Sequence, residues 1–177
     1  MHFRSIFSSS TSLKTVNLIR DEVLDQPKRF AELFELIFDA EKPNIAWRAA
    51  WAAEKVSEAQ TDFFTEKEII RLINHSLIVK HGGLQRSILS ILINLPLPEN
   101  IPVEFINACF ERTISTSQPV AVQALSMRML QRVAKKEPAF IPEIIATLEN
   151  VDLTAMSAGY VAVRRNIMTR LLKRLKS

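Results

Sequence analysis

Ile45-Ala-Trp-Arg-Ala-Ala-Trp-Ala-Ala-Glu-Lys-Val56 is the first of four similar stretches of the chain. It is followed by Leu84-Gln-Arg-Ser-Ile-Leu-Ser-Ile-Leu-Ile-Asn-Leu95, by Val120-Ala-Val-Gln-Ala-Leu-Ser-Met-Arg-Met-Leu130 and by Val161-Ala-Val-Arg-Arg-Asn-Ile-Met-Thr-Arg-Leu-Leu172. Arg48, Arg86, Gln123 and Arg165 hold comparable places, at steps of 38, 37 and 42 residues. Self-similarity at a period of this length is typical of stacked helical repeats. The repeat predicts the architecture of the chain but not its activity.

The composition supports an all-α chain with a substantial core. The chain has 177 residues, of which 47% are hydrophobic, and only three are glycines. Alanine, leucine, glutamate, lysine and arginine, which favour helices, are abundant. We expect a single helical-repeat domain over residues 1–177, in which residues 1–11 form a frayed N-terminal segment.

Prolines and polar breaks divide the rest of the chain into nine predicted helices. Ser12 is a candidate N-cap, Pro27 and Pro43 suit first helical turns, and Gly82 and Gly83 mark a break. These helices pair in order as one N-terminal helix and four hairpins, which bury their apolar faces by stacking. The expected ranges are 13–24, 27–39, 43–58, from 62 or 65 to 79, from the glycine break to 94, 102–115, 118–136, 138–149, and from 157 or 159 to the end.

The second helices of the hairpins carry a family resemblance. Trp47-Arg48-Ala49-Ala50 and Val163-Arg164-Arg165-Asn166 resemble the second helices of HEAT and armadillo repeats, specifically those of small bacterial HEAT-like proteins. The resemblance covers residues 27–177 and implies a right-handed α-α superhelix whose second helices line a groove. HEAT repeats usually place an acidic residue six positions before the basic residue of the second helix. Lys42, Lys80 and Gly159 occupy those places in this chain.

The first copy of the repeat contains paired tryptophans. Trp47 and Trp51 are four residues apart, so they share one helix face, and Glu54 and Glu58 lie on the same side. Two interpretations stay open: the rings pack between adjacent hairpins, or they form an aromatic wall in the groove. In the second case, these four residues are candidate partner-binding residues, and the glutamates favour a cationic partner such as a basic peptide.

The last copy of the repeat is strongly basic. Residues 101–177 carry eleven Lys/Arg against six Asp/Glu, whereas the rest of the chain is nearly balanced. Two interpretations stay open here as well: a solvated helix end that suits the helix dipole, or a site for nucleic acid or another anionic partner. Arg164 falls within the apolar face, which indicates a snorkelling or internally paired side chain. The candidate residues for an anionic partner are Arg165, Arg170, Lys173, Arg174 and Lys176.

Motifs for catalysis, metals and cofactors are missing from the sequence. The single cysteine, Cys109, excludes an intramolecular disulfide and has apolar neighbours, so we expect a buried, inert thiol in a reducing cytoplasm. His75 and His81 are six residues apart without a completing ligand set, so neither a metal nor a cofactor is expected. No hydrolase elbow, zinc-protease or dinucleotide motif occurs, nor any apolar run long enough to span a membrane.

The sequence therefore predicts a non-catalytic scaffold in the cytoplasm. Its expected partner is another protein or a peptide, bound in a groove lined by the second helices. The alternative is a nucleic-acid-binding protein related to the HEAT-like DNA glycosylases specific for alkylated bases, acting through the basic C-terminal helix. The sequence names neither a partner nor an oligomeric state.

Overall fold

The computed structural model describes residues 2–9 and 12–176 of the chain. All regular structure in this part is helical, as predicted for an all-α repeat solenoid. The chain divides into two compact units, unit 1 over Met1–Pro98 and unit 2 over Glu99–Ser177. The right-handed sense of the superhelix and the assignment of residues 1–177 to one domain stay predictions.

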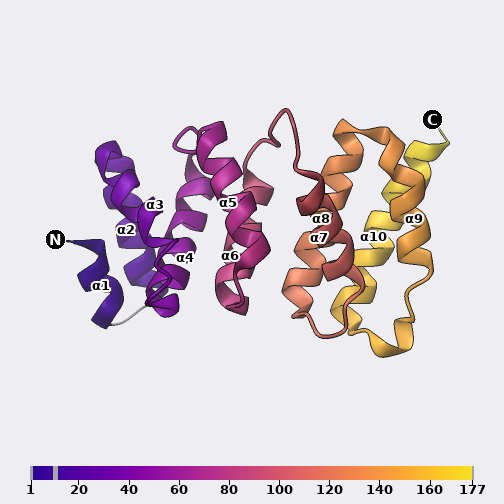
Figure 1. Ribbon diagram of the computed structural model, residues 1–177, viewed down its shortest axis with the longest axis horizontal. Helices are drawn as coiled ribbons and strands as arrows, with labels where there is room; N and C mark the ends of the chain where they lie inside the picture. Colours follow the sequence, from indigo (N-terminus) through magenta and orange to yellow (C-terminus); the bar gives the residue numbers. More distant parts are fainter. Residues whose placement is uncertain (1, 10–11, 177) are drawn as a thin grey trace. The chain divides into compact units, whose positions relative to one another are not determined.

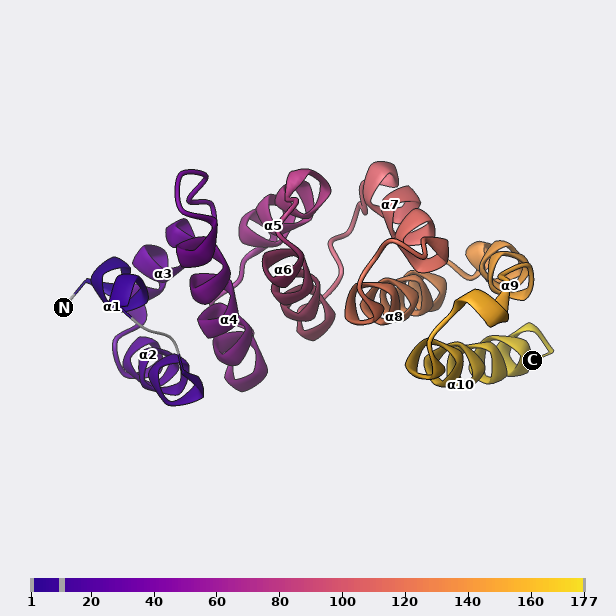
Figure 2. The ribbon, with the colours of Figure 1, turned by 90° about the horizontal axis from the view of Figure 1, so that it is seen from below.

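Unit 1 contains two layers of helices (Figures 1 and 2). The second-helix layer is formed by α2, α4 and α6, in which α4 packs against both of its neighbours. The other layer holds α1, α3 and α5; α1 contacts both α3 and α4, and α5 packs on α6. The bounds are α1 Phe3–Ser9, α2 Leu13–Asp25, α3 Phe30–Leu36, α4 Pro43–Ala59, α5 Glu66–Ile78 and α6 Gly82–Asn94, with a 3-10 turn at Pro27–Arg29 before α3.

Unit 2 repeats the same plan with two hairpins. The helices α7 and α8 pack against each other, α9 packs on α10, and the two second helices, α8 and α10, are in direct contact. The bounds are α7 Val103–Ile114, α8 Val120–Lys136, α9 Ile141–Glu149 and α10 Ala158–Leu175, with 3-10 turns at Pro138–Phe140 and Leu153–Ala155.

Local capping explains where these helices begin and end. The Ser12 hydroxyl accepts a hydrogen bond from the backbone N–H of Thr15 at 3.2 Å, which confirms the predicted N-cap of α2. Pro43 occupies the first turn of α4, also as predicted. By contrast, the helix expected over 27–39 ends at Leu36. The carboxylate of Asp39 accepts bonds from two backbone N–H groups just beyond this point, which favours a turn over further helix.

The N-terminal segment differs from the expectation of fraying. Residues 3–9 form α1, and both Phe3 and Phe7 are fully buried. The backbone N–H of Phe3 donates to Glu32 Oε1 at 2.7 Å, and the Phe7 carbonyl accepts a hydrogen bond from Arg48. These contacts hold α1 on α3 and α4, so the prediction of a frayed segment is wrong for residues 3–9. The rest of that prediction, at residues 1, 10 and 11, lies outside the described residues.

Side chains of second helices bind backbone carbonyls of first helices. In unit 2, Gln123 Nε2 donates to the carbonyl of Ser115, directly after α7, at 2.7 Å. In the same way, Arg164 Nε donates to the carbonyl of Leu148 in α9 at 2.6 Å. Leu148 lies in the last turn of α9, where helix carbonyls lack an intrahelical partner, whereas the Ser115 carbonyl also accepts from the backbone N–H of Gln118. In the fourth copy of the repeat, Arg164 is therefore the residue equivalent to Gln123, since it makes the same kind of bond. The neighbouring Arg165, which the sequence alignment placed there, is exposed.

Candidate interaction surfaces

The two tryptophans of α4 stack on one another. Their ring centroids are 6.4 Å apart and the ring planes differ by 7°. Both side chains are half-buried, although their surroundings are not the same. The role of the pair in partner binding stays a prediction.

Trp47 packs between adjacent hairpins. Its ring lies 5.8 Å from that of His81, which caps α6 by accepting a hydrogen bond from the backbone N–H of Leu84 at 3.1 Å. A Cβ atom on Gly83 would approach Trp47 Nε1 to 2.9 Å, so the indole occupies the space that this glycine leaves. The buried Trp47 Nε1 has no hydrogen-bond acceptor among the described residues. The ring is part of the α4–α6 contact.

Trp51 lies on the stripe of α4 that is exposed to solvent, which we call the outer stripe. It is followed by Lys55 and Glu58 at the i, i+4 and i+7 positions of a helix, which fall on one face. Lys55 is half-buried and Glu58 is exposed, whereas Ala52, Ala53 and Val56 are fully buried on the opposite side. Trp51 thus lies at the boundary between core and solvent.

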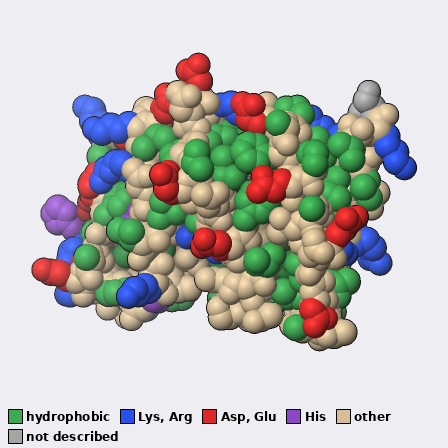
Figure 3. Space-filling view, turned by 45° about the vertical axis from the view of Figure 1, so that its right-hand side comes forward, with side chains coloured by type: hydrophobic (Ala, Val, Ile, Leu, Met, Phe, Trp, Pro, Cys, Tyr) green, Lys and Arg blue, Asp and Glu red, His purple; other side chains and the backbone are tan. Residues whose placement is uncertain are grey.

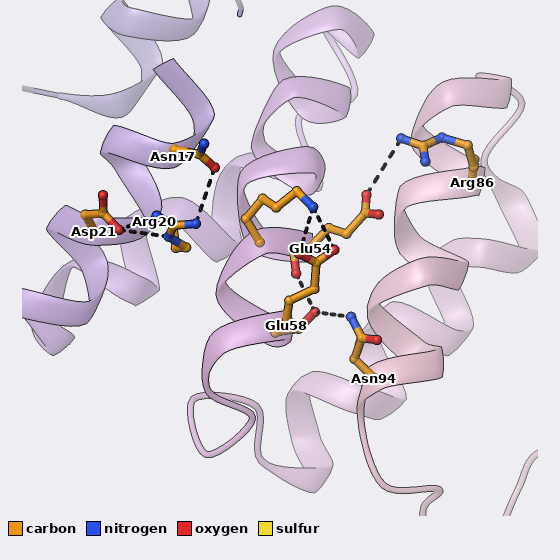
Figure 4. Close-up of polar contacts among 9 residues, drawn as sticks. Asn17, Arg20, Asp21, Glu54, Glu58, Arg86 and Asn94 are labelled. Atoms are coloured by element: carbon orange, nitrogen blue, oxygen red, sulfur yellow. Dashed lines mark hydrogen bonds and ion pairs between the residues drawn. The ribbon is translucent and has the colours of Figure 1, made fainter. Parts of the chain in front are cut away.

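Glu54 and Glu58 already have cationic neighbours within unit 1 (Figure 4). Glu54 Oε2 lies 3.7 Å from Arg86 Nη2 on α6, and Glu58 accepts from Lys55 Nζ at 2.7 Å. Burial raises the pKa of the Glu54 carboxyl, and the charge of Arg86 only partly opposes this effect. On α2, Arg20 pairs with Asp21 at 2.7 Å. This surface therefore carries opposite charges in balance and no surplus of negative charge.

The cationic residues predicted at the C-terminus are exposed on α10 and directly after it. Arg174 Nη1 also donates to the carbonyl of Ala134 in α8 at 3.3 Å, which locates the side of α10 that faces α8. The internally paired side chain predicted for Arg164 is confirmed by its bond to Leu148. The exposed residues are Arg165, Arg170, Lys173, Arg174 and Lys176.

The sequence reasoning missed the basic residues of α8. Arg128 and Lys135 are exposed on this helix, and Arg132 between them is half-buried. A signal was present, because residues 120–136 contain four Lys/Arg and no Asp/Glu. On the face shown in Figure 3, acidic side chains stand apart among hydrophobic ones, and lysine and arginine side chains lie mostly at its margins.

The residues considered for metal or thiol chemistry pack against neighbouring side chains, cap a helix or are buried. His75 packs on the Phe38 ring with 4.9 Å between the ring centroids, while His81 caps α6. Within residues 2–9 and 12–176, no three His, Cys, Asp or Glu side chains gather in a way that could hold a metal ion. Cys109 is fully buried, and burial raises its pKa to about 12. Among the described helices, none is both long and apolar enough to cross a bilayer.

Comparison with known proteins gives a family for the chain. A family model described as a HEAT repeat domain matches residues 3–171. Searches of curated proteins and of solved structures found no significant match. The matched range includes α1, which the resemblance seen in the sequence, starting at residue 27, had left out. The chain therefore belongs to the HEAT repeat family of helical-repeat scaffolds.

Proposed function

We propose that this chain is a non-catalytic scaffold that binds a partner protein. The partner would bind on the solvent-exposed side of α2, α4 and α6, with Trp51 as the anchor. The observation that carries the proposal is the position of Trp51, half-buried on the outer stripe of α4 and stacked on Trp47. Tryptophan is enriched among the residues that contribute most to protein–protein binding. A ring held in place by a neighbour loses little conformational freedom when a partner covers it.

The charges around Trp51 favour a protein over a simple polyion. Arg20, Lys55 and Arg86 are paired with Asp21, Glu58 and Glu54, so cations and carboxylates balance across the three helices. This balance removes the reason for preferring a basic peptide. A partner with its own pattern of both charges matches such a surface, and rim charges of this kind set specificity and association rate more than affinity.

A substitution at Trp51 tests the proposal. Partners captured from cells of the native organism would be identified and then measured with the purified chain. We expect Trp51→Ala to weaken binding by at least about 2 kcal/mol, or roughly 30-fold in Kd, with little loss of thermal stability. The control is Ile78→Ala, which removes an exposed side chain of α5. Equal binding by the Trp51→Ala chain and the unsubstituted chain would disprove this site.

Nucleic-acid binding is the second candidate function, and a separate observation in unit 2 favours it. Arg165, Arg170, Lys173 and Lys176 are exposed and form no ion pair with any described residue. We propose binding without base excision, because the carboxylates beside the tryptophans are engaged in ion pairs. For either candidate we place the protein in the cytoplasm, with which the lone buried Cys109 is consistent.

A further inference from the structure

We infer that α8 and α10 together form a phosphate-binding face for duplex nucleic acid, which we call the cationic face and which consists of Arg128, Lys135, Arg170 and Lys173. The inference rests on the second candidate function and changes its location. Two of the four residues come from α8, and two of the residues expected from the sequence, Arg165 and Lys176, fall outside the face.

Charge in unit 2 is separated by helix layer. The second helices α8 and α10 carry nine Lys/Arg and no Asp/Glu. The first helices α7 and α9 carry four glutamates and a single arginine, Arg112. A random spread of these charges would place acids on both layers. Since no carboxylate lies on α8 or α10, nothing on these helices neutralises their cations, and the layer attracts anions.

The α8 part of the face lies opposite its buried side. Val122, Met129 and Val133 are buried, whereas Arg128 and Lys135, seven residues apart, are exposed on one stripe of the helix. At a rise of 1.5 Å per residue, their Cα atoms are about 10 Å apart along the axis. Neither side chain has a hydrogen bond or an ion pair with a described residue, so both are available to a ligand.

Helical geometry places the basic residues of α10 at increasing angles from the side that faces α8. Arg174 reaches the carbonyl of Ala134, so its side of α10 faces α8. Arg170 lies one turn earlier, about 40° from Arg174 around the axis. Lys173 lies at the edge of that side, about 100° from Arg174 and about 60° from both Arg170 and Lys176. Arg165 is nine residues from Arg174, which turns it by about 180° and directs it away from α8.

Lys176 follows the helix and keeps roughly the direction of Arg165, from which it is eleven residues away. Arg165 and Lys176 are both exposed, as are the four residues of the cationic face. They therefore provide a matched pair of cations in the same unit that does not share the α8 side.

The side chains of the cationic face favour a duplex over a single strand or a membrane. The only aromatic residue of α8 and α10 is Tyr160, which is fully buried, so no ring is exposed for stacking on unpaired bases. Insertion into lipid needs apolar side chains among the cations. The exposed large apolar side chains of the two helices are Val120, Leu172 and Leu175. Leu172 has the direction of Arg165, Leu175 is about 140° from Arg170 and Val120 is about 80° from Arg128, so none of them lies on the same stripe as Arg128 or Arg170. Arginine and lysine contact the phosphates of a duplex backbone without exposed aromatic rings or apolar side chains.

The test is fluorescence anisotropy with a labelled DNA duplex of mixed sequence, about two helical turns long, between about 50 mM and about 200 mM salt. Four phosphate contacts predict a slope of about −3.6 for log K against log salt concentration. We expect Arg128→Glu combined with Lys135→Glu to weaken binding at least tenfold and to reduce the slope by about 2. Arg165→Glu combined with Lys176→Glu makes the same change in charge, and we expect it to change Kd less than threefold. Circular dichroism melting checks that each chain remains folded.

Each other result has a defined meaning. Failure of the unsubstituted chain to bind any nucleic acid would overturn both the second candidate function and this inference. Duplex binding that is lost in the Arg165/Lys176 variant, but kept in the Arg128/Lys135 variant, would overturn the inference alone. Tighter binding to a single strand of equal length, to an acidic peptide or to vesicles containing phosphatidylserine would overturn the assignment of a duplex.

Discussion

Glu54 and Arg86 face each other across α4 and α6, but they differ in exposure. The Glu54 side chain is 11% exposed and that of Arg86 is 37% exposed, with 3.7 Å between Oε2 and Nη2. The Glu54 carboxylate is therefore largely desolvated, whereas the Arg86 guanidinium keeps much of its hydration. The cost of burial therefore falls mainly on Glu54, whose pKa is raised in spite of its cationic neighbour.

This asymmetry predicts opposite effects at the two ends of the pair. Glu54→Gln should raise the free energy of unfolding at neutral pH, because a neutral amide of similar shape is cheaper to bury than the carboxylate. Arg86→Met should lower it by about 1 kcal/mol, since Glu54 then stays buried without a countercharge. Urea denaturation measures both changes.

The same pair predicts a dependence on pH. Because the pKa of Glu54 is raised in the folded state, the folded chain binds more protons than the unfolded chain between its usual pKa and the raised one. Stability from this group then rises as the pH falls through that interval. The advantage of the Glu54→Gln chain should shrink accordingly, and an advantage that stays constant with pH would contradict the explanation.

Gly83 should be needed for the packing of Trp47. A Cβ atom at this position would lie 2.9 Å from Trp47 Nε1 and 3.2 Å from its Cδ1, so Gly83→Ala forces the ring to move. We expect a loss of about 1–3 kcal/mol in the free energy of unfolding, as for an overpacked core. Gly82→Ala is the control, because Gly82 is exposed and no described glycine has a positive φ. A similar loss in both variants would show that the backbone, and not the indole, requires glycine.

His75 should make the protein less stable in mild acid. Burial lowers its pKa, and a backbone hydrogen bond with Ile37 only partly opposes this effect. The unfolded chain therefore binds a proton at a higher pH than the folded chain, and stability falls as the pH decreases below about 6.5. His75→Gln removes this contribution. The difference in unfolding free energy between the two chains, followed from neutral pH down to about pH 5, should change in favour of the variant.

The short helix α1 should contribute to stability through its buried rings. Phe7→Ala removes a fully buried ring beside the carbonyl that accepts from Arg48, and we expect a loss of about 3 kcal/mol or more. Ser5→Ala changes an exposed side chain of the same helix and should alter stability by less than about 0.5 kcal/mol. If Phe7→Ala were equally harmless, α1 would not be docked in solution.

Most helix bounds could be predicted from the sequence because they depend on local chemistry. Pro43 and Ser12 act within the first turn of the helices that they start, so no knowledge of the fold is needed. The helix α1 was missed because seven residues give little periodicity. The spacing of Phe3 and Phe7 at i and i+4 was a usable signal, although their burial depends on α3 and α4, which come later in the chain.

The candidate surfaces were harder to predict because neighbouring residues in a sequence acquire different partners in space. Trp47 and Trp51 look equivalent in the sequence, yet only Trp47 meets Gly83 in the first turn of α6. Arg164 and Arg165 are adjacent, but one binds a carbonyl of α9 while the other remains exposed. Contacts between helices determine these differences, and the helical period alone does not reveal them.

Gln123 and Arg164 each make a hydrogen bond to a carbonyl in or directly after the first helix of the same hairpin. These bonds bear on how the number of hairpins can change in evolution. Each of these hairpins contains both the donor and the acceptor of the bond that closes it. Duplication of a gene segment that encodes one such hairpin would therefore add both the donor and the acceptor of this bond. Deletion of the segment would remove both together. Since each repeat mainly contacts its neighbours, whole hairpins are units that evolution or protein engineering can add and remove.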